Sequence, residues 1–187
     1  MKLYHTGFEE IRDPDIRAGR ANADFGQGFY LSPDYDFSMA WSRLRKDKEV
    51  IVNSYELDTD GLKIFELKRD EEWYDYIFHN RNGYPDRFKD ADVLIGPIAN
   101  DTIYDTWGIL TSGFLSKEKS LKLLSLGPDY SQVVIKSSKA LSHLHFLSSS
   151  VIPKDTVYEN KKKQREEEKA YQEALLSHLK DKRELFE

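Results

Sequence analysis

Short runs of apolar residues, many of them β-branched or aromatic, recur at irregular intervals over the first 152 residues. Runs of this length, bounded by glycine, proline and small polar residues, are typical of β-strands. The stretch "EVIVNSYELD" is the richest in β-branched residues, and "ADVLIGPIA" is apolar enough for a buried strand. The pattern predicts strands over residues 2–7, 28–32, 49–58, 62–67, 91–99, 130–138 and 145–152.

Helices are predicted where a capping residue precedes a stretch of mixed polarity. Ser32 can cap a helix that has Pro33 in its first turn and runs to about Lys46. Asp70 can cap residues 71–80, and Ser116 can cap residues 116–126. Helical segments are also predicted over 100–114 and 139–144, whereas the polar segment 8–28, which glycines interrupt, is predicted to be a loop.

The composition changes at Lys154, where the chain becomes dense in charge and free of glycine and proline. Tyr171, Ala174, Leu175 and Leu179 form a thin apolar stripe at helical spacing, which predicts one long, partly docked helix. We therefore expect a domain over residues 1–153 and a charged C-terminal helix over 154–187. Because the strands and helices do not alternate regularly, the fold class is α+β, with an antiparallel or split sheet.

Composition narrows the functional classes. Of the 187 residues 39% are hydrophobic and 33% are charged, and the formal net charge is only -5. This balance argues against a broadly basic nucleic-acid binder. It does not exclude a local basic groove, because the net charge does not report how the charges are distributed. There is no cysteine, which excludes disulfides and thiolate catalysis. The N-terminus lacks an apolar signal core and no apolar run could cross a bilayer, so we expect a cytoplasmic protein without a membrane partner.

Candidate chemistry lies near two glycine-containing segments. In "YHTG", His5 and Thr6 precede Gly7, a residue that lets a ligand approach the backbone closely. In "DFGQGFYLSPDYDFSMAW", Gly28 and Phe29 precede Tyr30, and Ser38 and Trp41 follow on the predicted helix. Tyr30 and Trp41 could form the walls of a slot for a flat ring, with Ser38 holding an amide group. Taken singly, each of these residues also has a plain structural interpretation, as a core aromatic, a satisfied histidine or a tight turn.

Together the segments "YHTG", "GQGFYLS", Ser38 and Trp41 resemble the NAD-binding core of the ADP-ribosyltransferase superfamily. They are most similar to its His-Tyr-Glu branch, which contains the diphtheria-type toxins and the poly(ADP-ribose) polymerases. Here Thr6 separates His5 from Gly7, and Gln132 in "SQVVIKSS" stands where that branch has a glutamate. Residues 2 to about 147 also resemble an uncharacterised bacterial family of this fold with blocks such as "DFGxGFYLT" and "IGPxAND", often encoded beside a small partner gene.

The resemblance implies a split antiparallel sheet with flanking helices and assigns a role to each matching residue. His5 would bond the adenosine ribose, and the Gly7 backbone and Ser38 would hold the nicotinamide amide. Tyr30 and Trp41 would sandwich the nicotinamide ring, and Gln132 would reach the hydroxyl of its ribose. We expect NAD⁺ as co-substrate and no metal; His143 and His145 lack a third ligand and are interpreted as structural.

An amide at position 132 can hydrogen-bond but cannot accept a proton. Asp101, in "GPIANDTIYD", is a candidate for the missing base, and a helix cap is the equal alternative. Arg20 is the candidate partner of the pyrophosphate, with Arg12 and Arg17 as alternatives.

The leading functional hypothesis is a mono-ADP-ribosyltransferase, the toxin of a bacterial toxin–antitoxin or phage-defence pair. Its acceptor would be a protein or a nucleic acid, and a small antitoxin protein would be a partner. The alternatives are an NAD glycohydrolase, with water as acceptor, and an inactive module that binds NAD or ADP-ribose and acts through protein contacts.

Overall fold

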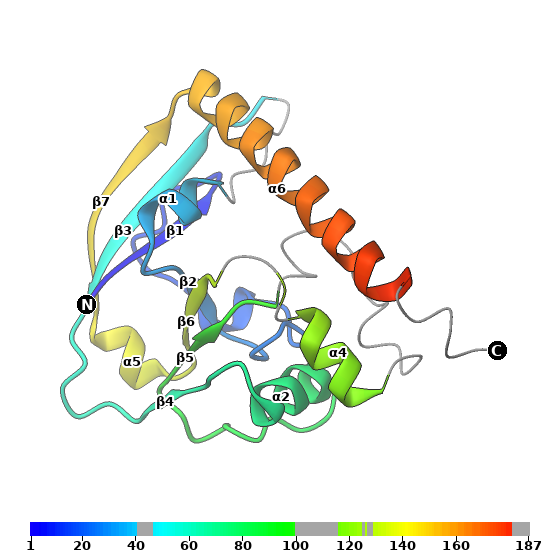
Figure 1. Cartoon of the computed structure of the whole chain (residues 1–187). Helices are drawn as coiled ribbons and strands as arrows, with labels where there is room; N and C mark the ends of the chain where they lie inside the picture. The colour runs from blue at the N-terminus through cyan, green and yellow to red at the C-terminus, as the bar shows by residue number, and fades with distance from the viewer. Residues whose placement is uncertain (41–46, 100–115, 125, 127–128, 181–187) are drawn as a thin grey trace.

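The computed structural model describes residues 1–40, 47–99, 116–124, 126 and 129–180. Within them the fold is α+β, with two sheets and helices packed around them (Figure 1). The residues of the predicted helix 100–114, including Asp101, and the second half of the predicted helix 33–46, including Trp41, lie outside the described residues. No described helix is long and apolar enough to span a membrane.

Two sheets divide the strands. The first has the order β1-β3-β7 and is antiparallel throughout, with β1 at Lys2–Gly7, β3 at Val50–Leu57 and β7 at Leu144–Ile152. The second has the order β2-β6-β5-β4, with β2 at Phe29–Leu31, β6 at Ser131–Ile135, β5 at Val93–Pro97 and β4 at Ile64–Glu66. All seven predicted strands are present. Strand β4 pairs with β5 in parallel, so the second sheet is mixed rather than antiparallel.

Among the described residues, the backbones of the two sheets are joined at one bridge, between β1 and the end of β2. Tyr4 and Ser32 exchange both backbone hydrogen bonds, each with an N–O distance of 2.8 Å. Beyond this bridge β1 continues along β3 and β2 continues along β6, so the sheets separate. The strands are therefore divided between two sheets, and the division lies beside His5 and Tyr30.

The helices begin at polar caps. The Asp70 side chain accepts a hydrogen bond from the Trp73 amide and caps α2, at Glu71–Arg81, as predicted. Helix α1 begins at Tyr35 and is described to Ala40. Its cap is Asp34, whose carboxylate accepts from the Phe37 amide at 2.9 Å, and not Ser32 as predicted. Ser32 sits two residues earlier, where its hydroxyl bonds the Asp34 amide. The other described helices are η1 at Ile16–Ala18, α4 at Lys117–Leu124, α5 at Ser138–Ser142 and α6 at Lys154–Lys180.

Apolar side chains form a core between the sheets and another behind the second sheet. Leu3 and Tyr55 from the first sheet meet Phe29 and Val133 from the second. The opposite face of the second sheet packs against α2, α4 and α6. Alternation along β6 explains both layers, because Val133 and Ile135 face the first sheet while Val134 faces the helices.

Helix α6 returns along the molecule from the end of β7 past α1 towards α4 (Figure 1). Val157 packs against the ends of β3 and β7. Tyr171 and Leu175, from the predicted apolar stripe, are buried in the same cluster as Phe37 of α1 and Leu124 of α4. The helix thus has one docked face along a mostly solvated length, as the sequence predicts.

Candidate functional site

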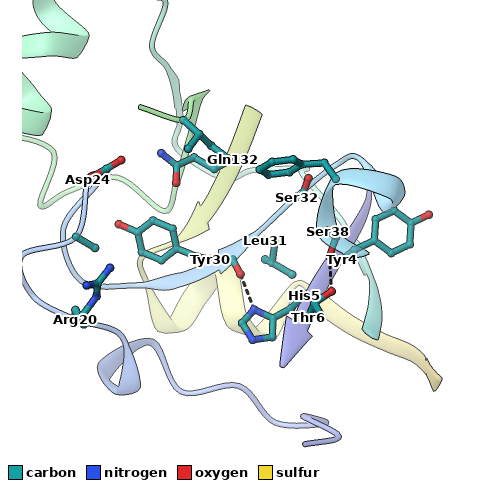
Figure 2. Close-up of a pocket in the computed structure, with 13 residues that line it drawn as sticks. Tyr4, His5, Thr6, Arg20, Asp24, Tyr30, Leu31, Ser32, Ser38 and Gln132 are labelled. Carbon is teal, nitrogen blue, oxygen red and sulfur yellow. Dashed lines mark hydrogen bonds between the residues drawn. The ribbon is translucent and has the colours of Figure 1, made fainter. Parts of the chain in front are cut away.

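A pocket of about 250 Å³ opens at the split between the two sheets (Figure 2). Its walls come from β1, the loop before β2, β2 itself, α1, the end of β5 and β6. The described lining residues are Tyr4, His5, Thr6, Arg20, Ala23, Asp24, Tyr30, Leu31, Ser32, Phe37, Ser38, Ile98 and Gln132.

Six of the residues singled out in the sequence line this one pocket: His5, Thr6, Arg20, Tyr30, Ser38 and Gln132. Gly7, Gly28 and Phe29 lie next to it in the chain but are not among its lining residues. The Phe29 side chain packs into the core between the sheets, 4.8 Å from the His5 ring centroid. Two of the predicted site residues lie outside the described residues: Trp41, the proposed second wall of the ring slot, and Asp101, the candidate base.

His5 occupies the place where backbone pairing between β1 and β2 stops. Its Nδ1 donates to the Tyr30 carbonyl oxygen at 2.8 Å, which extends the single Tyr4–Ser32 bridge by a side-chain bond. Only a protonated Nδ1 can donate to a carbonyl, so in the neutral ring Nε2 is an acceptor. Burial lowers the pKa of His5 below its usual 6.5, partly offset by the bond to Tyr30, so the ring is neutral at pH 7.

Tyr30 presents its ring to the pocket, while its hydroxyl belongs to the preceding loop. The hydroxyl donates to the Gly26 carbonyl at 2.7 Å and accepts from the Phe25 amide at 2.9 Å. Burial, followed by the negative charge of Asp24, raises the pKa of this phenol far above its usual 10. The Tyr30 ring therefore lines the pocket, while its hydroxyl holds the glycine-containing loop in place. The hydroxyl does not exchange protons near neutral pH.

Thr6 and Ser38 form a hydroxyl pair across the pocket from β1 to α1. Their oxygens are 2.9 Å apart, and one hydroxyl donates to the other (Figure 2). The pair keeps one O–H donor and several acceptor lone pairs available. This is the complement of a carboxamide, which offers an N–H₂ donor and a carbonyl acceptor.

Gln132 lies on β6, one position beyond the last residue pair with β2. Its side chain is buried, and its Nε2 makes a long contact of 3.5 Å with the Pro97 carbonyl oxygen. In Figure 2 the Gln132 amide lies on the same side of the pocket as the Tyr30 ring and Asp24. The amide can bond a ligand hydroxyl but supplies no charge.

The loop that carries Asp24 is held by buried polar contacts from distant parts of the chain. Asp24 forms an ion pair of 2.8 Å with Arg81 of α2, and both side chains are at most 5% exposed. Asn80 donates to the Asp24 carbonyl at 2.9 Å. Lys136, after β6, donates to the Phe25 carbonyl at 2.6 Å. These contacts fix the loop against the second sheet and hold the pocket wall in one place.

Lys136 is in turn fixed by a second ion pair. Its ammonium lies 2.5 Å from Asp86, whose other oxygen accepts from the Tyr76 hydroxyl at 2.8 Å. Burial would raise the pKa of Asp86, but the hydrogen bond and charge of Lys136, together with the bonds from Tyr76 and the Phe88 amide, lower it. The first ion pair joins the loop before β2 to α2, and the second joins the end of β6 to the segment that follows α2.

Sequence reasoning missed Asp24, Phe37, Ser32 and Tyr4 in the pocket. Asp24 carried no signal, because its partner Arg81 is 57 positions away. Phe37 is a core residue whose ring stacks on Tyr130 at 3.9 Å between centroids and also lines the pocket. The places of Tyr4 and Ser32 in the pocket depend on the bridge between them, and the sequence does not show this bridge.

The described residues contain no group of three or more histidine, aspartate or glutamate side chains placed to hold a metal ion. Polar contacts in the pocket therefore come from hydroxyl, amide, imidazole, carboxylate and guanidinium groups. Such a set suits a ligand that has an aromatic amide, sugar hydroxyls and an anionic group.

The model of a family described as "Protein of unknown function (DUF3990)" matches residues 1–146. The matched residues include every described lining residue of the pocket. A search among curated proteins found no match to the chain.

Proposed function

Because the chain belongs to the DUF3990 family, whose description assigns no activity, we propose a function from the pocket itself. We propose that the protein is an NAD⁺-dependent mono-ADP-ribosyltransferase that releases nicotinamide and transfers ADP-ribose to a protein or nucleic-acid acceptor. The observation that carries the proposal is the convergence of His5, Tyr30, Ser38 and Gln132 on one cavity from four different elements. These are the residues on which the sequence resembles the ADP-ribosyltransferases.

The chemistry of the lining residues matches the nicotinamide end of NAD⁺. The Tyr30 ring offers a flat face for the nicotinamide ring, and the Thr6–Ser38 hydroxyl pair complements its carboxamide. Gln132 can bond a hydroxyl of the attached ribose. The cavity of about 250 Å³ is smaller than the roughly 300–1,000 Å³ typical of sites that bury a drug-sized ligand, so it takes one part of the dinucleotide.

Two other lining residues, His5 and Arg20, suit the remaining parts of NAD⁺. His5 is neutral with Nδ1 committed to Tyr30, so Nε2 can accept a bond from a sugar hydroxyl. Arg20 is a cation at the pocket wall for the pyrophosphate.

In the reaction the bond between the ribose C1′ and the nicotinamide nitrogen breaks, and its electron pair leaves with nicotinamide. Positive charge develops on the ribose. The contribution of the pocket is to fix the ring, the amide and the ribose so that C1′ is exposed to the acceptor. The rigid loop before β2 supports this, because positioning requires walls that do not move.

The test is to incubate the protein with NAD⁺ labelled in its adenine half, with and without cell lysate, and to measure nicotinamide release. Label on a macromolecule supports the transferase, and free ADP-ribose alone indicates a glycohydrolase. We expect His5→Ala to weaken NAD⁺ binding by about fivefold, because a hydrogen bond to a neutral group contributes on the order of 1 kcal/mol. Tyr30→Ala should abolish turnover.

The matched control is His145→Ala, since His145 is an exposed histidine on β7 away from the pocket. It should bind and turn over NAD⁺ like the unaltered protein. Absence of any NAD⁺ binding by the unaltered protein would contradict the proposal. Binding without turnover would favour an inactive binding module.

The biological setting that we propose is that of a toxin, paired with a small antitoxin protein in a bacterial toxin–antitoxin or phage-defence system and acting in the cytoplasm. This part rests on the sequence resemblance alone.

A further inference from the structure

Asp24 is the only acidic side chain among the described residues that line the pocket. Its carboxylate is 5% exposed and lies at the loop before β2, with Arg81 at 2.8 Å behind it. In Figure 2 the carboxylate is directed towards the side of the pocket where Gln132 and the Tyr30 ring lie. The charge of Asp24 also acts on the Tyr30 hydroxyl, whose pKa it helps to raise.

A buried carboxylate that lines a ligand pocket is costly unless it is paired. The ion pair with Arg81 offsets this cost and sets the direction of the carboxylate. A carboxylate has about four lone-pair sites on two oxygens, so a bond to Arg81 is compatible with a further bond to a ligand hydroxyl. The loop is also fixed by Asn80 and Lys136, so the carboxylate cannot move away when a ligand enters.

We propose that Asp24 is the catalytic carboxylate of this pocket, in the place that Gln132 cannot fill. This inference rests on the proposed function. The carboxylate stabilises the cation that develops on the nicotinamide ribose and accepts the proton of the attacking group. Gln132, which lies on the same side of the pocket, positions the ribose by hydrogen bonding.

The step balances without any further reactant. The C1′–N bond breaks and its electron pair leaves with nicotinamide, which becomes neutral. An O–H or N–H group of the acceptor forms the new bond to C1′ with its lone pair. Its proton passes to the Asp24 carboxylate and from there to solvent, so NAD⁺ and the acceptor yield ADP-ribosylated acceptor, nicotinamide and one proton.

The primary test is Asp24→Asn, which keeps the shape of the side chain but removes the charge and the ability to accept a proton. We expect turnover of NAD⁺ to fall by about 10²-fold, the lower end of what general bases contribute. The dissociation constant for NAD⁺ should stay within about threefold. Nicotinamide release is measured from labelled NAD⁺ in buffer and in cell lysate, and NAD⁺ binding is measured by calorimetry.

Two further variants, Arg81→Met and Asp24→Asn/Arg81→Met, distinguish a structural role of Asp24 from a catalytic one. If the ion pair only holds the loop, Arg81→Met loses as much activity as Asp24→Asn, and the double variant recovers because no buried charge is left unpaired. If Asp24 is catalytic, the double variant stays inactive although it is folded and binds NAD⁺. Thermal unfolding monitors the folded fraction of each variant.

A gain-of-function variant sharpens the test. On the Asp24→Asn background, Gln132→Glu returns a carboxylate to the same side of the pocket. We expect it to restore turnover by at least about tenfold, which a purely structural Asp24 would not permit.

Four results would overturn the inference: an Asp24→Asn protein with more than a tenth of normal turnover, a loss that follows only NAD⁺ affinity, a loss that follows only the folded fraction, or a double variant that recovers turnover. The failure of the proposed function is distinguishable from these. An unaltered protein that neither binds nor cleaves NAD⁺ overturns both, whereas an active protein with an active Asp24→Asn variant overturns this inference alone.

Discussion

His5 links the architecture of the split sheet to the proposed chemistry. Its Nδ1 bonds the Tyr30 carbonyl where the backbone pairing between β1 and β2 ends. The ring therefore stabilises the edges of the pocket that it lines, and it does so as a neutral group. A protonated ring would keep the Nδ1 bond but lose the Nε2 acceptor and gain an unpaired, partly buried charge.

This environment predicts a pH dependence of stability. Because the pKa of His5 in the folded protein lies below its usual 6.5, the unfolded chain takes up a proton before the folded protein does as the pH falls. His5 therefore contributes nothing above about pH 7.5 and lowers the free energy of unfolding below pH 6.5, by at most about 1.4 kcal/mol per pH unit. Urea unfolding at pH 7.5 and pH 5.5 measures the effect.

The informative comparison is with His5→Gln, whose amide can still donate to the Tyr30 carbonyl but does not titrate. The variant should lose less stability between the two pH values than the unaltered protein. The exposed His145→Gln variant should behave like the unaltered protein. Equal losses in all three proteins would show that His5 is not desolvated in solution.

At the scale of elements, the sequence was informative where the signal is local. Asp70 caps α2 as predicted, because a capping residue and the helix that follows it are visible within a few positions. The cap of α1 was misassigned to Ser32, since serine and aspartate are both good caps two residues apart and only the Asp34–Phe37 bond distinguishes them.

The pairing between elements could not be predicted from the sequence in the same way. The parallel partnership of β4 with β5, and the place where the sheet splits, depend on contacts between residues far apart in the chain. The same holds for Asp24, whose neighbours in sequence gave no hint of Arg81. Six of the candidate site residues nevertheless line the same pocket, although they come from four elements and the loop before β2.

Gly28 illustrates a requirement of an element rather than of a ligand. A Cβ atom at this position would lie 2.6 Å from Val134 Cγ1 and 2.7 Å from the Ile135 carbonyl oxygen. Gly28→Ala should therefore push β2 away from β6 and lower the free energy of unfolding by about 1–3 kcal/mol, as overpacked substitutions do. Urea denaturation measures this change directly.

Gly7→Ala is the matched control for that substitution. A Cβ at Gly7 would have its nearest neighbour, His5 Nε2, at 3.5 Å, which is an ordinary contact. Its stability should therefore equal or slightly exceed that of the unaltered protein, since alanine restricts the unfolded chain more than glycine does. If both variants lost the same amount, close packing of β2 on β6 would not be the reason for the glycine at position 28.

At the scale of the whole molecule, α6 lies beyond the residues that the DUF3990 model matches, yet it closes part of the core. Tyr171 and Leu175 pack in the same cluster as Phe37, and Phe37 lines the pocket. Helix α6 therefore packs against α1 and contributes to the cluster that holds Phe37. The boundary at residue 153 stays a prediction, but the docked face gives the helix a measurable share in the stability of the preceding domain.

Two adjacent leucines test this docking. Leu175 is 7% exposed within the core cluster, whereas Leu176 is 53% exposed. Leu175→Ala should lower the free energy of unfolding by about 2–5 kcal/mol, the range for buried leucine-to-alanine changes, and Leu176→Ala should change it by less than about 0.5 kcal/mol. Both substitutions favour helix equally, so helix propensity cancels in the comparison. Equal and small effects would mean that α6 is undocked in solution, and Phe37 would then lack the support on which this wall of the pocket depends.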